Sequence, residues 1–93
     1  MKNKKINSVR IKLDNLDNKL LDLIKKRTSL VNQILKAKKF KKQIVDKKRI
    51  KVILKRIRKK SQQRKIDTKL TNRIWKSMIY SYIDYEKRNF KKK

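Results

Sequence analysis

Apolar residues recur three, four or seven positions apart along most of the chain, which is the spacing that forms one face of an amphipathic helix. The first pattern predicts a long helix from about Ile6 to Lys39, with a stripe formed by Leu13, Leu16, Leu20, Leu23, Val31 and Ile34. A second helix is expected to begin near Asp46, and its stripe consists of Ile50, Ile53, Leu54 and Ile57. A third is expected to begin near Asp67, and its apolar face consists of Leu70, Ile74, Trp75, Met78, Ile79 and Tyr82. Aspartate is a preferred N-cap residue, so the two carboxylates mark where these helices begin.

The segments between these patterns are short and polar, and the chain has neither Gly nor Pro with which to build sharp turns. We therefore expect an all-α fold of three helices, one long and two shorter, with connectors at about residues 39–45 and 58–66. A helix of more than about thirty residues spans roughly 50 Å, and two shorter helices cannot cover all of its stripe. A second copy could cover the rest, so we expect an intertwined homodimeric helical bundle. Residues 1–93 form a single domain in this interpretation, with a basic tail at about 88–93.

Composition excludes several classes of chemistry. The chain has no Cys and no His, so it has no disulfide framework, no thiolate nucleophile and no histidine base or metal ligand. Without Gly it cannot form a phosphate-binding loop or a dinucleotide-binding fingerprint. No apolar run is long enough to cross a bilayer, and the N-terminal "MKNKKINSVR" lacks the apolar core of a secretory signal. We therefore expect a cytoplasmic protein that uses no metal and has no membrane partner.

The formal net charge of +26 comes from 33 Lys and Arg residues against 7 acids. Such a balance raises the alternative of a basic helical nucleic-acid-binding protein, with aromatic residues such as Trp75, Tyr80 and Tyr85 as contacts. Lys, Ile and Asn are all abundant, however, which is the composition that an AT-biased genome would impose. We therefore interpret most of the lysines as solvated helix faces. Binding that weakens steeply with salt would favour the nucleic-acid alternative.

Two cations interrupt the apolar stripe of the long helix. Arg27 and Lys38 are eleven residues apart, which is three helical turns with roughly 20° of drift, so they share a face about 16 Å apart along the axis. Both side chains are long enough for their charged ends to close on a small anion. Val31 and Ile34 lie between them and would form the floor of such a pocket.

A third cation, Arg10, lies roughly 25 Å before Arg27 along the same helix and cannot reach that ligand within its own chain. In an antiparallel pair of long helices centred near residue 21, the partner's Arg10 lies opposite residue 32, between Arg27 and Lys38. The dimer would then have two equivalent sites, each with an arginine from the other chain.

The shorter helices contribute three further candidates. Arg49 lies in the first turn of the second helix, where the helix dipole disfavours a cation, so it serves something other than helix stability. Glu86, four residues after Tyr82, falls on the apolar face of the third helix. Asp46 is expected to cap the N-terminus of the second helix, whether or not it also contacts a ligand. Each residue alone has an ordinary structural explanation, such as a border side chain whose charged end reaches water. Their joint placement is what indicates a site for a small dianion.

These residues resemble the pattern of the small, all-helical, dimeric chorismate mutases. The matching segments, in chain order, are Arg10 followed by "LDNLDNKLLDLIKKR", "ILKAKK" and "IVDKKR". The stretch "IDTKLTNRIWKSMIYSYIDYE" matches the family's third helix more loosely. The resemblance covers about residues 8–87, and the positions that fall at the family's spacing are Arg10, Asp17, Arg27, Lys38, Asp46 and Arg49.

The resemblance implies an isomerase that rearranges chorismate, a dicarboxylate, to prephenate for phenylalanine and tyrosine biosynthesis, without a cofactor, a metal or a covalent intermediate. It implies two catalytic residues. Lys38 would donate to the substrate's ether oxygen and to a carboxylate, and Glu86 would be the second group at that oxygen. To donate there, Glu86 must carry a proton, so we expect activity to rise as the pH falls from about 8 to 5.

The same resemblance assigns the substrate-binding residues. Arg10 from the partner chain and Arg27 would hold the two carboxylates, which suit the two-pronged guanidinium group. Asp46 and Arg49 would lie at the hydroxyl-bearing end of the ring, and Tyr82 would line the pocket.

The chain departs from the family's usual pattern at three positions. Ile50 stands where a glutamate usually accepts from the substrate hydroxyl, Tyr82 where a small hydroxyl residue is common, and Glu86 where glutamine is more frequent. These changes leave a second alternative open: a homologue that binds the dianion with weak or no turnover.

Overall fold

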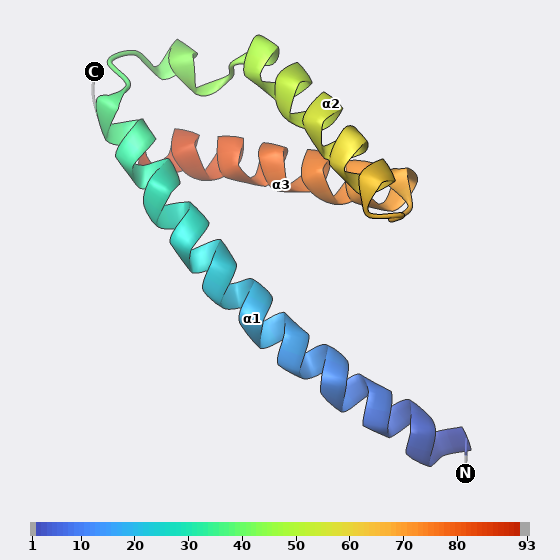
Figure 1. Cartoon of the computed structure of the whole chain (residues 1–93). Helices are drawn as coiled ribbons and strands as arrows, with labels where there is room; N and C mark the ends of the chain where they lie inside the picture. Colours follow the sequence, from blue (N-terminus) through green and yellow to red (C-terminus); the bar gives the residue numbers. More distant parts are fainter. Residues whose placement is uncertain (1, 92–93) are drawn as a thin grey trace. The chain divides into compact units, whose positions relative to one another are not determined.

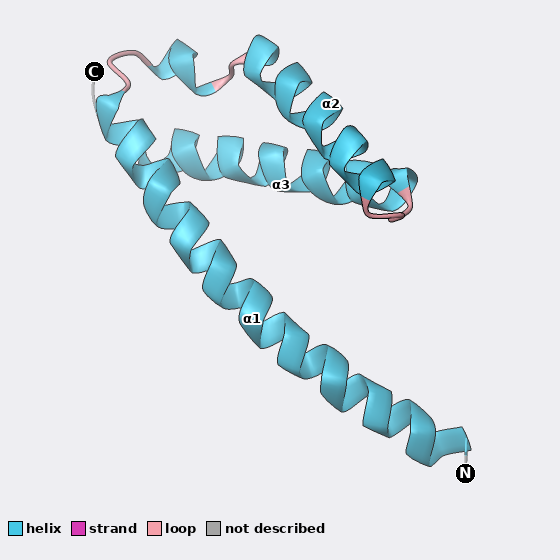
Figure 2. Ribbon diagram, in the orientation of Figure 1, coloured by secondary structure: helices cyan, strands magenta, loops and turns pink. Residues whose placement is uncertain are grey.

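The computed structural model describes residues 2–91, and these residues form helices joined by short loops (Figure 1, Figure 2). In chain order the elements are α1 (Lys2–Ala37), a 3₁₀ turn η1 (Lys41–Ile44), α2 (Lys47–Gln63) and α3 (Thr68–Asn89). No strand occurs among the described residues, so the prediction of an all-α chain with one long and two shorter helices is confirmed. Of the expected basic tail, residues 88 and 89 belong to α3, and residues 92 and 93 lie outside the described range.

The end of α1 is fixed by side-chain and backbone hydrogen bonds rather than by a glycine. The N–H of Lys38 is shared between the carbonyls of Ile34 and Leu35, at 3.2 Å each, which closes the last turn. The side-chain Oε1 of Gln43 then accepts the N–H of Lys39 at 2.7 Å and that of the next residue at 2.8 Å. The helix therefore stops two residues before the predicted Lys39, and Lys38 lies immediately beyond its last residue.

Aspartate residues begin both shorter helices, as predicted. Asp46 Oδ1 accepts the N–H of Arg49 at 3.0 Å at the start of α2. Asp67 Oδ1 accepts the N–H of Lys69 at 2.8 Å at the start of α3. Each cap satisfies a backbone donor that no helical carbonyl can reach, and such a cap contributes about 1 kcal/mol.

The end of α2 was predicted wrongly. The helix continues six residues beyond Ile57 to Gln63, through most of the segment 58–66 that we expected to be a connector. That segment has few apolar residues, but it is rich in Lys, Arg and Gln, which all form helices readily.

A tight turn without glycine joins α2 to α3. The N–H of Ile66 donates to the carbonyl of Ser61 at 2.9 Å, and the N–H of Lys65 donates to that of Gln62 at 3.1 Å. This pair of bonds is a Schellman motif, which needs a left-handed residue at its centre. Lys65 supplies it with φ 56°, a conformation that glycine adopts at a lower cost.

The described residues divide into two units, residues 2–33 and residues 34–91. In the second unit α2 packs against α3, and the buried apolar side chains are Leu35, Ile44 and Ile79. A pair of buried hydroxyl groups also joins the two helices: Ser61 Oγ lies 2.7 Å from Thr71 Oγ1. The Ser61 hydroxyl is also 2.7 Å from a helix carbonyl, so it can bond to both partners.

In residues 2–33, α1 presents its apolar stripe to solvent. Leu16 and Leu20 are each 54 % exposed and Leu23 is 59 % exposed. A run of large apolar side chains at this exposure is uncommon on a protein that functions as a monomer. The helices of the described range contain no segment long and apolar enough to span a membrane.

Candidate active site

The centre of the candidate site is an ion pair between residues 48 positions apart in the sequence. Lys38 Nζ donates to Glu86 Oε1 at 2.9 Å, and the exposed fractions of the two side chains are only 18 % and 9 %. Lys38 is placed there by the closed end of α1, and Glu86 by the buried face of α3. The two residues that the resemblance implies at one reacting atom are therefore in direct contact.

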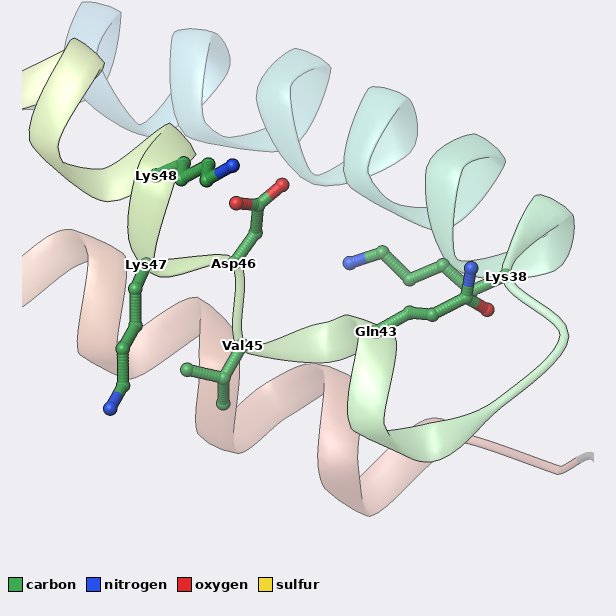
Figure 3. A pocket seen from close by; sticks show the side chains of 6 residues that line it. All are labelled: Lys38, Gln43, Val45, Asp46, Lys47 and Lys48. Atoms are coloured by element: carbon green, nitrogen blue, oxygen red, sulfur yellow. The ribbon is translucent and has the colours of Figure 1, made fainter.

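A cavity of about 590 Å³ adjoins Lys38. Its lining comes from the end of α1, from η1 and from the start of α2, and consists of Lys38, Gln43, Val45, Asp46, Lys47 and Lys48. Figure 3 shows the Lys38 side chain extending across the cavity toward Asp46. The cavity thus has cationic groups on two sides and one carboxylate among them, which suits a small anion that also carries a hydroxyl group.

Asp46 has one oxygen to spare for such a ligand. Its Oδ1 is used in capping Arg49, and within residues 2–91 its Oδ2 has no hydrogen-bond partner. The cap also fixes the backbone of Arg49 in the first turn of α2, while the Arg49 side chain is exposed. Asp46 therefore combines a structural role with an available acceptor.

A comparison with models of protein families matches residues 9–87 to chorismate mutase type II. The match spans most of the chain. The chain belongs to the chorismate mutase type II family. No curated protein and no solved structure matches it.

The family match includes the two arginines on α1 that were predicted to bind the carboxylates of chorismate. Arg27 is half-buried and Arg10 is exposed. Both belong to the unit of residues 2–33, whereas Lys38 and Glu86 belong to the second unit. Their roles in a chorismate mutase stay predictions.

Two departures from the usual chorismate mutase pattern lie on the helices around Glu86. Tyr82, one turn before Glu86, is half-buried, and its ring packs edge-on against that of Tyr85, with centroids 6.3 Å apart. Ile50 is half-buried, and its N–H donates to the Asp46 carbonyl at 3.0 Å. Ile50 has no polar side-chain atom for the hydroxyl of chorismate, whereas Asp46, one turn earlier, has Oδ2.

The sequence interpretation missed Gln43 as a residue of this site. It sits in the segment predicted to be a connector, where a glutamine three residues after Phe40 closes the turn η1. That spacing matches the glutamine of a capping box, but Phe40 stands where the box needs Ser or Thr, so the sequence carried no clear signal for Gln43. Within residues 2–91, no group of three or more His, Cys, Asp or Glu side chains is arranged to hold a metal ion.

Proposed function

We propose that this chain is a chorismate mutase, an isomerase of the shikimate pathway that converts chorismate to prephenate on the route to phenylalanine and tyrosine. Family membership supports the assignment, and the observation that carries it to these residues is the Lys38–Glu86 pair beside a cavity with Asp46. The rearrangement needs no base and no nucleophile. It depends on holding the folded conformer of the substrate and on stabilising the charge that develops, so a chain without His or Cys can perform it.

In this mechanism Lys38 and Glu86 act on the ether oxygen, where negative charge grows as the bond breaks. The ammonium group of Lys38 has three donors, and one of them is occupied by Glu86 when the site is empty. A protonated Glu86 would donate to the ether oxygen itself and leave the lysine donors to the substrate. Both groups are shielded from water, which strengthens their electrostatic effect on the transition state.

The other proposed residues bind and orient the substrate. Arg27 and the partner's Arg10 hold the two carboxylates, and Arg49 lies toward the hydroxyl-bearing end. Asp46 Oδ2 accepts from the substrate hydroxyl in place of the family's usual glutamate, since Ile50 cannot.

The dimer is part of the proposal because one chain leaves both the apolar stripe and the site incomplete. The α1 side chains Leu13, Leu16 and Leu20 are 52–54 % exposed, and burying such groups contributes about 25 cal/mol for each Å² removed from water. A second copy packed along this stripe would also supply Arg10 to the other chain's site.

The test is the loss of chorismate absorbance with the purified protein, in the wild type and in the variants Lys38→Ala and Lys39→Ala. Loss of one positioned donor typically lowers the turnover number about 10²–10³-fold, which is the expected result for Lys38→Ala. Lys39 is its matched control, because it is an exposed lysine at the next position with the same charge. Wild-type protein that binds chorismate without converting it would identify a dianion-binding homologue instead. Equal losses in the two variants would contradict the role of Lys38.

A further inference from the structure

The acidic side chains of residues 34–91 are engaged elsewhere and do not neutralise the basic side chains of α2. Asp46 and Asp67 cap helices, and Asp84 and Glu86 are in ion pairs. Nine of the 17 residues of α2 are basic and none is acidic; the basic ones are Lys47, Lys48, Arg49, Lys51, Lys55, Arg56, Arg58, Lys59 and Lys60. No ion pair of residues 2–91 involves α2. Mobile counterions therefore balance most of this charge.

Part of this charge lines a groove between α2 and α3, with a volume of about 450 Å³. Three cations line it, Lys55 and Arg58 from α2 and Lys69 from α3, together with Leu54, Thr68 and Asn72. We call this set the cationic groove. The nearest acid in sequence is Asp67, whose Oδ1 is engaged with the backbone N–H of Lys69.

The cationic groove shares no residue with the apolar stripe of α1 or with the candidate active site. On α3, Lys69 and Asn72 point roughly 150° away from the exposed apolar residues Leu70 and Ile74, at about 100° per residue. A second copy that covers those apolar residues leaves the groove open. Its lining shares no residue with the cavity beside Lys38.

The positive charge continues beyond the groove along both helices. On α2 the residue one turn before Lys55 on the same side is Lys51, and on α3 the corresponding residues one and two turns beyond Lys69 are Arg73 and Lys76. All three are exposed. A cationic track with no closed end suits a polymer with regularly spaced charges better than a small anion.

We propose that the cationic groove binds the phosphodiester backbone of a nucleic-acid strand, as a second binding activity separate from the mutase site. Lysine and arginine on phosphates release condensed counterions, which provides affinity without reading the sequence. No aromatic ring lines the groove, so bases have no surface on which to stack. The binding is therefore independent of base sequence.

The test measures the anisotropy of a labelled oligothymidine of about 20 nucleotides, longer than the ~4–16 nucleotides that one small domain covers. Salt is varied between about 50 and 200 mM, because the slope of log affinity against log salt counts the phosphate contacts. The groove variant is Lys55→Gln/Arg58→Gln/Lys69→Gln. The control variant is Lys4→Gln/Lys25→Gln/Lys26→Gln, which removes the same charge from exposed positions on α1.

We expect the groove variant to lower the slope by about 2, since each contact to a single strand contributes about 0.7, and the control to change it by less than about 0.5. Circular dichroism establishes that both fold, and if the triple variant does not, Arg58→Gln alone should lower the slope by about 0.7. Equal losses in both triple variants would show that only net charge matters and would overturn the groove. So would wild-type protein that ignores the oligonucleotide at low salt, or that binds only vesicles of anionic lipid.

Discussion

Replacing Glu86 with Gln should raise activity at neutral and alkaline pH and remove its pH dependence. In the structure Glu86 Oε1 accepts from Lys38 Nζ at 2.9 Å, and an ionised glutamate in this arrangement has no proton to donate to the ether oxygen. A glutamine can do both at any pH, because its carbonyl oxygen accepts from Lys38 while its amide nitrogen donates to the substrate.

The size of the effect follows from the value of one positioned donor, which is about 10²–10³-fold in turnover. We expect Glu86→Gln to exceed the wild type by at least about tenfold at about pH 8, a conservative part of that value. Exchanging a charged acceptor for a neutral one at this pair should cost about 0.5–1.5 kcal/mol of unfolding free energy.

The assay is the initial rate of chorismate loss at half-unit steps between about pH 5 and 8, for both proteins, with thermal melts at each end. The wild-type rate should fall as pH rises, and the variant's rate should stay flat. The melting temperature of the variant should be lower by roughly 4–8 °C per kcal/mol lost. A folded variant that is slower than the wild type at every pH would refute a proton-donating role for Glu86.

Two further predictions concern the stability of the α2–α3 pair, and a third concerns the proposed shared site. Lys65→Gly should raise the unfolding free energy by about 0.5–1 kcal/mol in a denaturant titration, because glycine relieves the left-handed backbone at φ 56°; a lower midpoint would contradict this. Ser61→Ala should lower the unfolding free energy by about 0.5–1.5 kcal/mol in the same titration, since the buried Thr71 hydroxyl loses its 2.7 Å partner and keeps only carbonyl contacts at 3.4 Å; an unchanged midpoint would count against that bond. Mixing Arg10→Ala with Lys38→Ala chains should restore partial activity, because one site of each heterodimer then carries neither change; mixtures as inactive as their parents would rule out a shared site.

The parts of this fold that local interactions determine were predictable, and the parts that depend on tertiary contacts were less so. Asp46 and Asp67 mark helix starts because each carboxylate bonds a donor within three residues. No comparable sequence signal ends α2. Lys65 occupies the left-handed position after the helix, where a glycine would have indicated the helix C-terminus. Residues after Ile57 lack an apolar stripe, yet Ser61 there is buried by packing on α3 rather than by its own hydrophobicity.

The site was predicted in a similar way. Spacing alone put Glu86 on the buried side of its helix, where it is 7 % exposed. Spacing carried no information that Lys38, 48 residues away, would be its partner; only the resemblance to a family related the two. Arg10 and Arg27 on α1 illustrate the remaining gap, because their contribution depends on how a second chain packs.

The scarcity of acids makes the burial of one of them informative. The chain has seven acids against 33 cations, and an exposed acid anywhere on its surface would reduce the repulsion among those cations. A largely buried ion pair is a weak means of stabilisation, because removing both charges from water offsets much of their attraction. Stability therefore does not explain why Glu86 is placed against Lys38 at a side-chain exposure of 9 %. The proposed reaction, which places a lysine and a proton donor at the same atom, does explain it, and Lys38 also lines a cavity large enough for a small anion.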